Sequence, residues 1–252
     1  MQKLCTSYIQ RRCGQTACVF EDIPSTNAVV KAYARQGAPA FTMAVAAAQS
    51  AGRGRGDHTF FSPKGTGVYL SILLRPTRSF APADVTATAA VAACNAIQAV
   101  CGVYAEIKWL NDIYVGGKKV AGILAECVWV DEMPAVVLGF GVNLLPPKEG
   151  FPPEIATRAG AVLKKSRMRF LRERMAIAFF GEFEKLYRNA TNVYAAYRER
   201  SFLLGKRVLF AGQEATVRDL LPDFRLELEL ASGEIKRLDS GEISLPDNKI
   251  IQ

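Results

Sequence analysis

Residues 52–56 read GRGRG, so three glycines alternate with Arg53 and Arg55, and His58, the only histidine of the chain, follows shortly after. Glycine lets a backbone approach a ligand closely and adopt positive φ angles. Arginine carries a permanent charge and a fork of donors that matches phosphate or carboxylate groups. The segment therefore predicts a loop that wraps around an anion, with a flexible surface turn as the alternative.

Two well-known phosphate-binding motifs do not fit this segment. A P-loop needs a G-K-[ST] sequence, which does not follow these glycines. A dinucleotide-binding fingerprint needs a helix that begins at the glycines. Here FFSPKGTG follows, and then an apolar run at 67–76 that is typical of a strand.

Three further segments combine polar groups with glycine at positions where a ligand could approach. They are KWLND at 108–112, KKVAGILAE at 118–126 and LGFGVNL at 138–144. Gly122 lies inside an apolar strand, where glycine costs stability and often marks the close approach of a ligand or another backbone. Each segment alone has an ordinary structural explanation, but the four together indicate one binding site.

With STN at 25–27 and GEISL at 241–245, these segments resemble biotin–protein ligases, in the same order and over nearly the whole chain. Bifunctional bacterial members carry an N-terminal DNA-binding domain before STN. Because this chain reaches STN by residue 25, it resembles the short, monofunctional class, and we expect no specific DNA binding.

The resemblance implies two reaction steps. The carboxylate of biotin attacks the α-phosphate of ATP and gives biotinyl-5'-AMP and pyrophosphate. A lysine of a biotin carboxyl carrier protein domain then attacks this mixed anhydride. Since the first step brings two anions together, it needs positive charge where they meet, and we expect Mg²⁺ to share that work.

The resemblance also assigns roles to individual residues. The expected catalytic residues are Lys119, Arg53, Arg55 and Asp112, with Asp112 also a Mg²⁺ ligand. The expected biotin-binding residues are Ser25, Thr26, Asn27, Gln49, Arg53, Gly54, Arg55, Lys119 and Gly122. The expected ATP-binding residues are Arg53, Arg55, His58, Phe60, Lys108, Asn111 and Asn143. Ser25 also fits a helix N-cap, and Phe60 also fits a core aromatic.

Four residues, in three segments, depart from the family pattern. Asp57 and His58 stand where the family usually continues with R-x-W, and imidazole is a cation only when protonated. Leu110 replaces the usual proline of KWPND, which we expect to loosen that turn. Pro246 follows GEISL where some members carry an ATP-binding arginine, so we assign no such function there.

The hydrophobic pattern predicts the elements that hold these residues. Helices are expected at 24–37, 83–102 and within 154–200, and strands at 40–49, 67–76 and 134–144. Residues 106–115 and 118–130 are expected to form a hairpin across Gly116 and Gly117. Residues 145–154 are rich in proline and predict a loop, and short strands follow Gly205.

These elements, together with the resemblance, predict an α+β fold. Its mixed, mainly antiparallel sheet is flanked by helices, as in the class II synthetase-like fold of biotin ligases. We expect a catalytic domain at residues 1–203 and a small SH3-like barrel at 204–252. The family also suggests a homodimer through the sheet edge near 118–126.

The composition limits the kind of partner and the cellular compartment that we expect for this protein. Half of the 252 residues are hydrophobic, and a net charge of +8 favours an anionic partner. Residues 158–174 hold seven Lys or Arg against one acid, which is typical of a solvated helix face. The six cysteines form no C-x-x-C, and the N-terminus lacks the apolar run of a signal peptide. We therefore expect a reduced, cytoplasmic protein without a membrane segment.

Three alternatives remain open at this stage. A lipoate or octanoyl transferase shares the fold and the carrier chemistry, although GRGRG and KWLND favour biotin. The net charge could indicate a nucleic-acid-binding regulator, but we find no reading helix and no basic–aromatic interleaving. A biotin-binding protein without catalysis is disfavoured by Lys119, Asp112 and Arg53.

Overall fold

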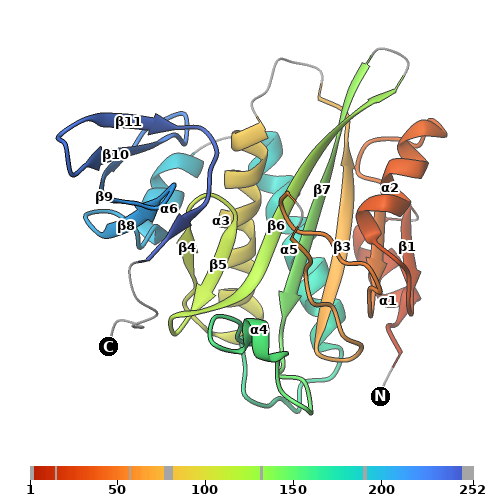
Figure 1. The fold of residues 1–252 in the computed structure, drawn as a ribbon. Helices are drawn as coiled ribbons and strands as arrows, with labels where there is room; N and C mark the ends of the chain where they lie inside the picture. Colours follow the sequence, from red (N-terminus) through yellow and green to blue (C-terminus); the bar gives the residue numbers. More distant parts are fainter. Residues whose placement is uncertain are drawn as a thin grey trace.

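A computed structural model of the chain describes residues 3–14, 16–56, 58–76, 82–130, 133–189 and 192–245. Asp57 and Pro246, two of the departures noted above, lie outside the described residues. The main body is built on a seven-stranded sheet of strand order β1-β2-β3-β7-β6-β5-β4 (Figure 1). Strands β1 and β2 are parallel, and every other neighbouring pair is antiparallel. The strands are β1 (Ala17–Phe20), β2 (Met43–Ala46), β3 (Gly67–Leu74), β4 (Glu106–Lys108), β5 (Asp112–Val115), β6 (Lys118–Val130) and β7 (Met133–Asn143).

Helices cover both faces of this sheet, which confirms the predicted α+β class. Helix α2 (Thr26–Arg35) packs on one face, over β2, β3 and β7. Helices α3 (Pro82–Cys101) and α5 (Leu171–Asn189) pack on the other face. The shorter helices α1 (Thr6–Cys13) and α6 (Val193–Arg200) pack against α5 and α3.

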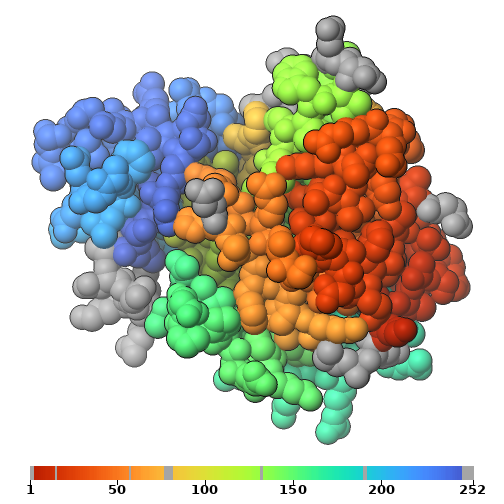
Figure 2. All heavy atoms as spheres, turned by 45° about the vertical axis from the view of Figure 1, so that its right-hand side comes forward, coloured from red at the N-terminus to blue at the C-terminus, as the bar shows by residue number. Residues whose placement is uncertain are grey.

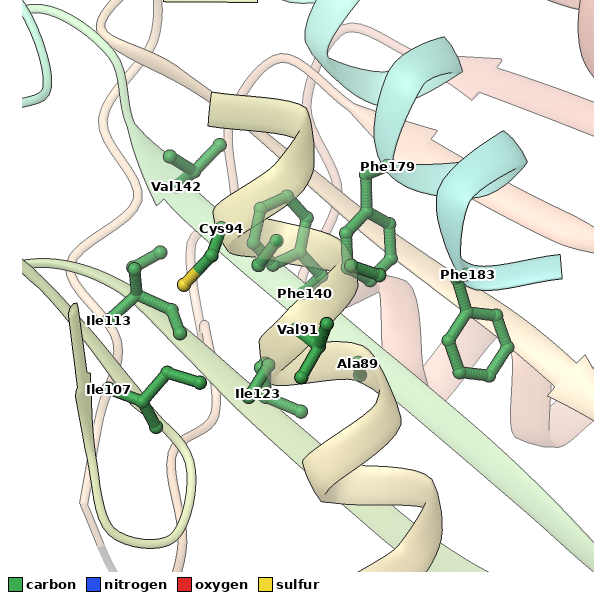
Figure 3. Packing of buried hydrophobic residues seen from close by; sticks show 14 of the residues in the cluster. Ala89, Val91, Cys94, Ile107, Ile113, Ile123, Phe140, Val142, Phe179 and Phe183 are labelled. Carbon is green, nitrogen blue, oxygen red and sulfur yellow. The ribbon is translucent and has the colours of Figure 1, made fainter. Parts of the chain in front are cut away.

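The main core lies between the sheet and the pair α3 and α5 (Figure 3). Phe140 of β7 stacks on Phe179 of α5 with ring centroids 4.0 Å apart. Because side chains alternate across a strand, neighbours of these core residues point to the opposite face, toward α2. On that second face a smaller apolar cluster includes Leu73 and Val137, and further along β7 the face carries Gly139, Gly141 and Asn143.

Several predicted elements differ in extent from the observed ones. The expected strand 106–115 is split, because residues 109–111 turn and separate β4 from β5. The expected helices within 154–200 are α4 (Pro153–Ala156), α5 and α6, while 157–170 is irregular. That stretch holds five Lys or Arg and no acid, and it lacks a helical apolar period. The helix face predicted at 158–174 is therefore wrong before residue 171. Helix α1 and strand β1 were not predicted.

The C-terminal strands form a second sheet of order β11-β10-β9-β8-β12. They are β8 (Arg207–Phe210), β9 (Gln213–Leu220), β10 (Leu226–Leu230), β11 (Ile235–Leu238) and β12 (Ile243–Ser244). Leu226, Leu228 and Leu230 are buried, as their alternation with Glu227 and Glu229 predicts. Within the described strands the sheet is open, with β11 and β12 at its edges, so the predicted SH3-like barrel is not confirmed.

Helix α3 is the one helix in the described part of the chain that is long and apolar enough to cross a membrane. Of its most apolar window, 67% is buried inside the fold. A core helix of a soluble fold passes the same test, so this length and composition are weak evidence for a membrane segment.

Candidate functional site

A cavity of about 590 Å³ lies on the face of the main sheet that α2 covers. Its walls come from the start of α2, the loop after β2, the turn between β4 and β5, and strands β6 and β7. All the residues that the sequence analysis assigned to biotin, ATP or catalysis line this cavity. They are Ser25, Thr26, Asn27, Gln49, Arg53, Gly54, Arg55, His58, Phe60, Lys108, Asn111, Asp112, Lys119, Gly122 and Asn143.

Glycines form the floor of the cavity. Gly122 of β6 pairs with Gly141 of β7, and Gly139 lies two residues before Gly141 in β7. A Cβ atom on Gly141 would lie 2.6 Å from the ring of Phe60, and one on Gly139 would collide with the side chain of Asn27. Because glycine has no side chain, Phe60 and Asn27 can pack directly against the strands at these positions.

The start of α2 forms one end of the cavity through a hydrogen-bond network. The Thr26 amide donates to Gln49 Oε1 at 2.8 Å, and Gln49 Nε2 donates to Ser62 Oγ at 3.0 Å. Ser71 Oγ of β3 donates to Thr26 Oγ1 at 2.7 Å and also contacts Asn27 Oδ1. Ser25 occupies the N-cap position, but within the described chain its side chain makes no capping hydrogen bond. Ser25 lines the cavity.

The glycine–arginine segment is a short hairpin. The backbone of Arg53 forms an antiparallel β-bridge with that of Thr59. The Gly54 amide donates to the His58 carbonyl at 2.7 Å. Arg55 Nη2 donates to the Gly241 carbonyl at 2.6 Å, in the segment between β11 and β12. Figure 2 shows this contact region, where the orange loop meets the blue C-terminal strands. The C-terminal strands thus form part of the cavity wall, with Gly241, Glu242 and Ile243.

Two of the residues expected to be catalytic lie at the other end of the cavity, by the turn between β4 and β5. Lys119 Nζ is 2.6 Å from Asp112 Oδ1, and both side chains are about one-third exposed or less. Asn111 Nδ2 donates to the Ile123 carbonyl at 2.9 Å, which ties the turn to β6. Burial lowers the pKa of Lys108, although Asp112 partly opposes this effect. The carboxylate of Asp112 therefore lies close to two lysines, Lys108 and Lys119.

Contacts from distant segments hold this turn. Trp109 Nε1 donates to the Phe224 carbonyl at 2.8 Å, and Tyr197 Oη donates to the Leu110 carbonyl at 3.0 Å. The peptide between Trp109 and Leu110 is cis. Both side chains are buried. Leu110 therefore occupies the family's proline position as part of the core.

Three polar residues beside the site were not predicted from the sequence. Ser71, Lys31 and Glu126 bond to predicted site residues or to one another. The signal for Glu126 was available, because strand alternation places residue 126 on the same face as Gly122. Ser71 and Lys31 carry no motif signal, since only the packing of α2 on the sheet brings them near.

The residues present fit a magnesium ion that is held mainly by phosphate groups. No cluster of three or more His, Cys, Asp or Glu that could hold a metal occurs among the residues described. Mg²⁺ at nucleotide sites commonly binds one or two carboxylates together with substrate phosphates and water. Asp112 is a carboxylate of the cavity lining that could serve in this way.

Comparisons with known proteins show the family of the chain. Residues 19–143 match the model of the biotin/lipoate A/B protein ligase family. The chain is 32% identical to a biotin–[acetyl-CoA-carboxylase] ligase of Mycobacterium tuberculosis over 234 residues, which cover 87% of this chain and 85% of that protein. It is 34% identical over 174 residues to the bifunctional ligase/repressor BirA of Bacillus spizizenii, covering 68% of this chain and 54% of that protein.

A solved structure shares the fold. The biotin protein ligase from Aquifex aeolicus in complex with biotin and ATP superposes with a TM-score of 0.73 at 22% identity. The match covers 91% of this chain and 98% of that one. The chain therefore belongs to the biotin/lipoate A/B protein ligase family, on its biotin–protein ligase branch. It spans about half the length of the BirA relatives that it matches.

Proposed function

We propose that this protein is an ATP-dependent biotin–protein ligase that makes biotinyl-5'-AMP and transfers biotin to a lysine of a biotin carboxyl carrier protein domain. The observation that carries the proposal is the polarity of the cavity. One end offers neutral hydrogen-bonding groups at Thr26 and Gln49, and the other places Lys119 Nζ 2.6 Å from Asp112 Oδ1. Such a cavity suits a ligand with a polar ring, an apolar middle and a carboxylate at its far end.

Each end of the cavity has a distinct task in the first step. Ser25, Thr26 and Gln49 would bind the ureido ring of biotin. The floor at Gly122 leaves room for the chain of biotin to reach the lysine. Lys119 and the arginines of the loop would neutralise the carboxylate and the α-phosphate as they approach. Asp112 holds the ammonium of Lys119 in position.

The nucleotide would bind beside Asn143. The side chain of Asn143 is buried, and its Oδ1 atom has no hydrogen-bond partner among the described residues. A buried acceptor without a donor is costly, so it favours a ligand that brings one, such as the amino group of adenine. Phe60, whose ring lies over Gly122 and Gly141, offers an aromatic face nearby.

Replacing Asn143 by alanine is expected to raise the KM for ATP about tenfold and to leave the KM for biotin within twofold, since only the nucleotide would lose a partner. Initial rates of pyrophosphate exchange at varied ATP and varied biotin measure both constants. Thermal unfolding should change little, because the lost oxygen has no bond to a described group. An equal rise in both constants would contradict the assignment to adenine.

The remaining assignments complete the proposal. Mg²⁺, held by Asp112 and substrate phosphates, would supply additional positive charge. The carrier lysine would enter near Asp112, whose carboxylate can orient an amine. We also propose that 1–203 and 204–252 are separate domains, the second an SH3-like barrel, and that the protein is cytoplasmic. The homodimer expected near residues 118–126 would have to use β6 beyond residue 122, because residues 118–122 pair with β5 inside the sheet. Specific DNA binding is not part of the proposal.

Pyrophosphate exchange into ATP, with purified protein and Mg²⁺, tests the proposed function directly. We expect exchange that depends on biotin and is absent with lipoate. Exchange with lipoate alone would place the protein with the lipoate ligases. Tight biotin binding without any exchange would identify a binding protein that lacks the chemistry.

A further inference from the structure

Glu126, on strand β6 outside the cavity lining, accepts contacts from three residues. Its Oε2 atom accepts a hydrogen bond from Asn27 Nδ2 at 2.7 Å. Its Oε1 atom accepts one from Lys31 Nζ, also at 2.7 Å. The same Oε1 atom lies 3.7 Å from Arg53 Nη1. One carboxylate oxygen is therefore shared between a lysine of α2 and an arginine of the glycine–arginine loop.

The surroundings favour the ionised form of Glu126. Burial alone would raise its pKa, but hydrogen bonds from Asn27 and Lys31 and the charge of Arg53 outweigh this effect and lower it. The side chains of Lys31 and Glu126 are each only 18% exposed, so solvent screens their charges weakly. The carboxylate is thus a permanent local anion beside Arg53.

Arg53 has two competing anionic partners if the proposed function holds. Its side chain is 53% exposed and lines the cavity, whereas Lys31 does not line it. When Arg53 turns to a phosphate group, Glu126 loses one cation. An unpaired, half-buried carboxylate would be costly, but Lys31 remains bonded to the same oxygen.

We propose, resting on the proposed function, that Lys31 and Glu126 form a positioning pair that determines how readily Arg53 is released to the nucleotide. Lys31 neutralises Glu126 and so weakens its attraction for Arg53. Without that ammonium, Glu126 retains Arg53 in its present contact and competes with the phosphate for it. Neither residue touches the substrates; both act through Arg53.

Replacing Lys31 by methionine keeps most of the side-chain stem and removes the charge. We expect the KM for ATP in biotin-dependent pyrophosphate exchange to rise about fivefold, with kcat within twofold, as for a coupling of modest size. Adding Glu126→Gln to Lys31→Met should return the KM for ATP to within twofold of the parent. Such a rescue would support the positioning role. If Lys31→Met acted only by breaking a structural ion pair, the double variant would be no better than the single one.

Lys64→Met is the matched control, because it breaks another lysine–carboxylate pair, with Glu21 at 3.0 Å, that does not involve Arg53. Its KM for ATP should stay within twofold. An unchanged KM in Lys31→Met, or a double variant as impaired as Lys31→Met, overturns the inference. Absence of biotin-dependent exchange in the parent protein would instead refute the proposed function itself, so the two failures are distinguishable.

Discussion

Lys119→Met is expected to lower the rate of biotin-dependent pyrophosphate exchange by about 10²–10³-fold, the largest single effect that we predict. The ammonium of Lys119 is held at 2.6 Å from Asp112, at the end of the cavity where two anionic substrates would meet. Methionine fills a similar volume without charge, so the loss should appear in kcat rather than in folding. Single-turnover formation of labelled adenylate measures this step.

The neighbouring lysine provides the control. Lys118 does not line the cavity, and its ammonium donates to the Thr157 carbonyl on the exposed surface. Lys118→Met should therefore keep at least one-third of the parent rate. If Lys119→Met retained a rate close to that of Lys118→Met, the positive charge of Lys119 would not be needed for the reaction.

Gly139→Ala is expected to impair both biotin binding and stability. A Cβ atom there would collide with the amide of Asn27, which cannot move freely because Ser71 and Glu126 both bond to it. Overpacking of this kind costs about 1–3 kcal/mol. We expect a fall in Tm of several degrees and a KM for biotin raised at least tenfold, measured by thermal unfolding and by exchange at varied biotin.

Gly181→Ala is the matched control for this glycine. Gly181 lies inside α5, and a Cβ atom at this position would meet no described atom within 4 Å. Because alanine favours a helix over glycine by up to about 1 kcal/mol, Tm should rise slightly and the KM for biotin should not change. Gly139→Ala with parent-like biotin kinetics would show that Asn27 does not shape the biotin end.

The sequence was most informative where function requires a rare residue combination. Glycines beside arginines, and glycine inside the strand at 122, are poor choices for stability, so their presence indicated a ligand. The strands with alternating apolar and polar residues could be predicted because burial of one face is also what stabilises them. The helical periodicity at 83–102 likewise led to α3, with errors of one residue at each end.

What could not be predicted depends on tertiary contacts. The break between β4 and β5 is held by Phe224 and Tyr197, more than eighty positions away in the chain. Lys31 looked like an ordinary solvated helix residue, and only the packing of α2 against β6 pairs it with Glu126. The C-terminal strands gave the alternation of a sheet, but alternation does not determine whether a sheet closes into a barrel.

The hydrogen bond from Arg55 to the Gly241 carbonyl joins residues 186 positions apart. One wall of the cavity comes from the segment between β11 and β12, and the rest comes from earlier residues. During synthesis on the ribosome, the earlier strands can pair long before that wall has been made. The wall of the cavity is therefore complete only once residues 241–243 have been synthesised and have folded against the earlier strands.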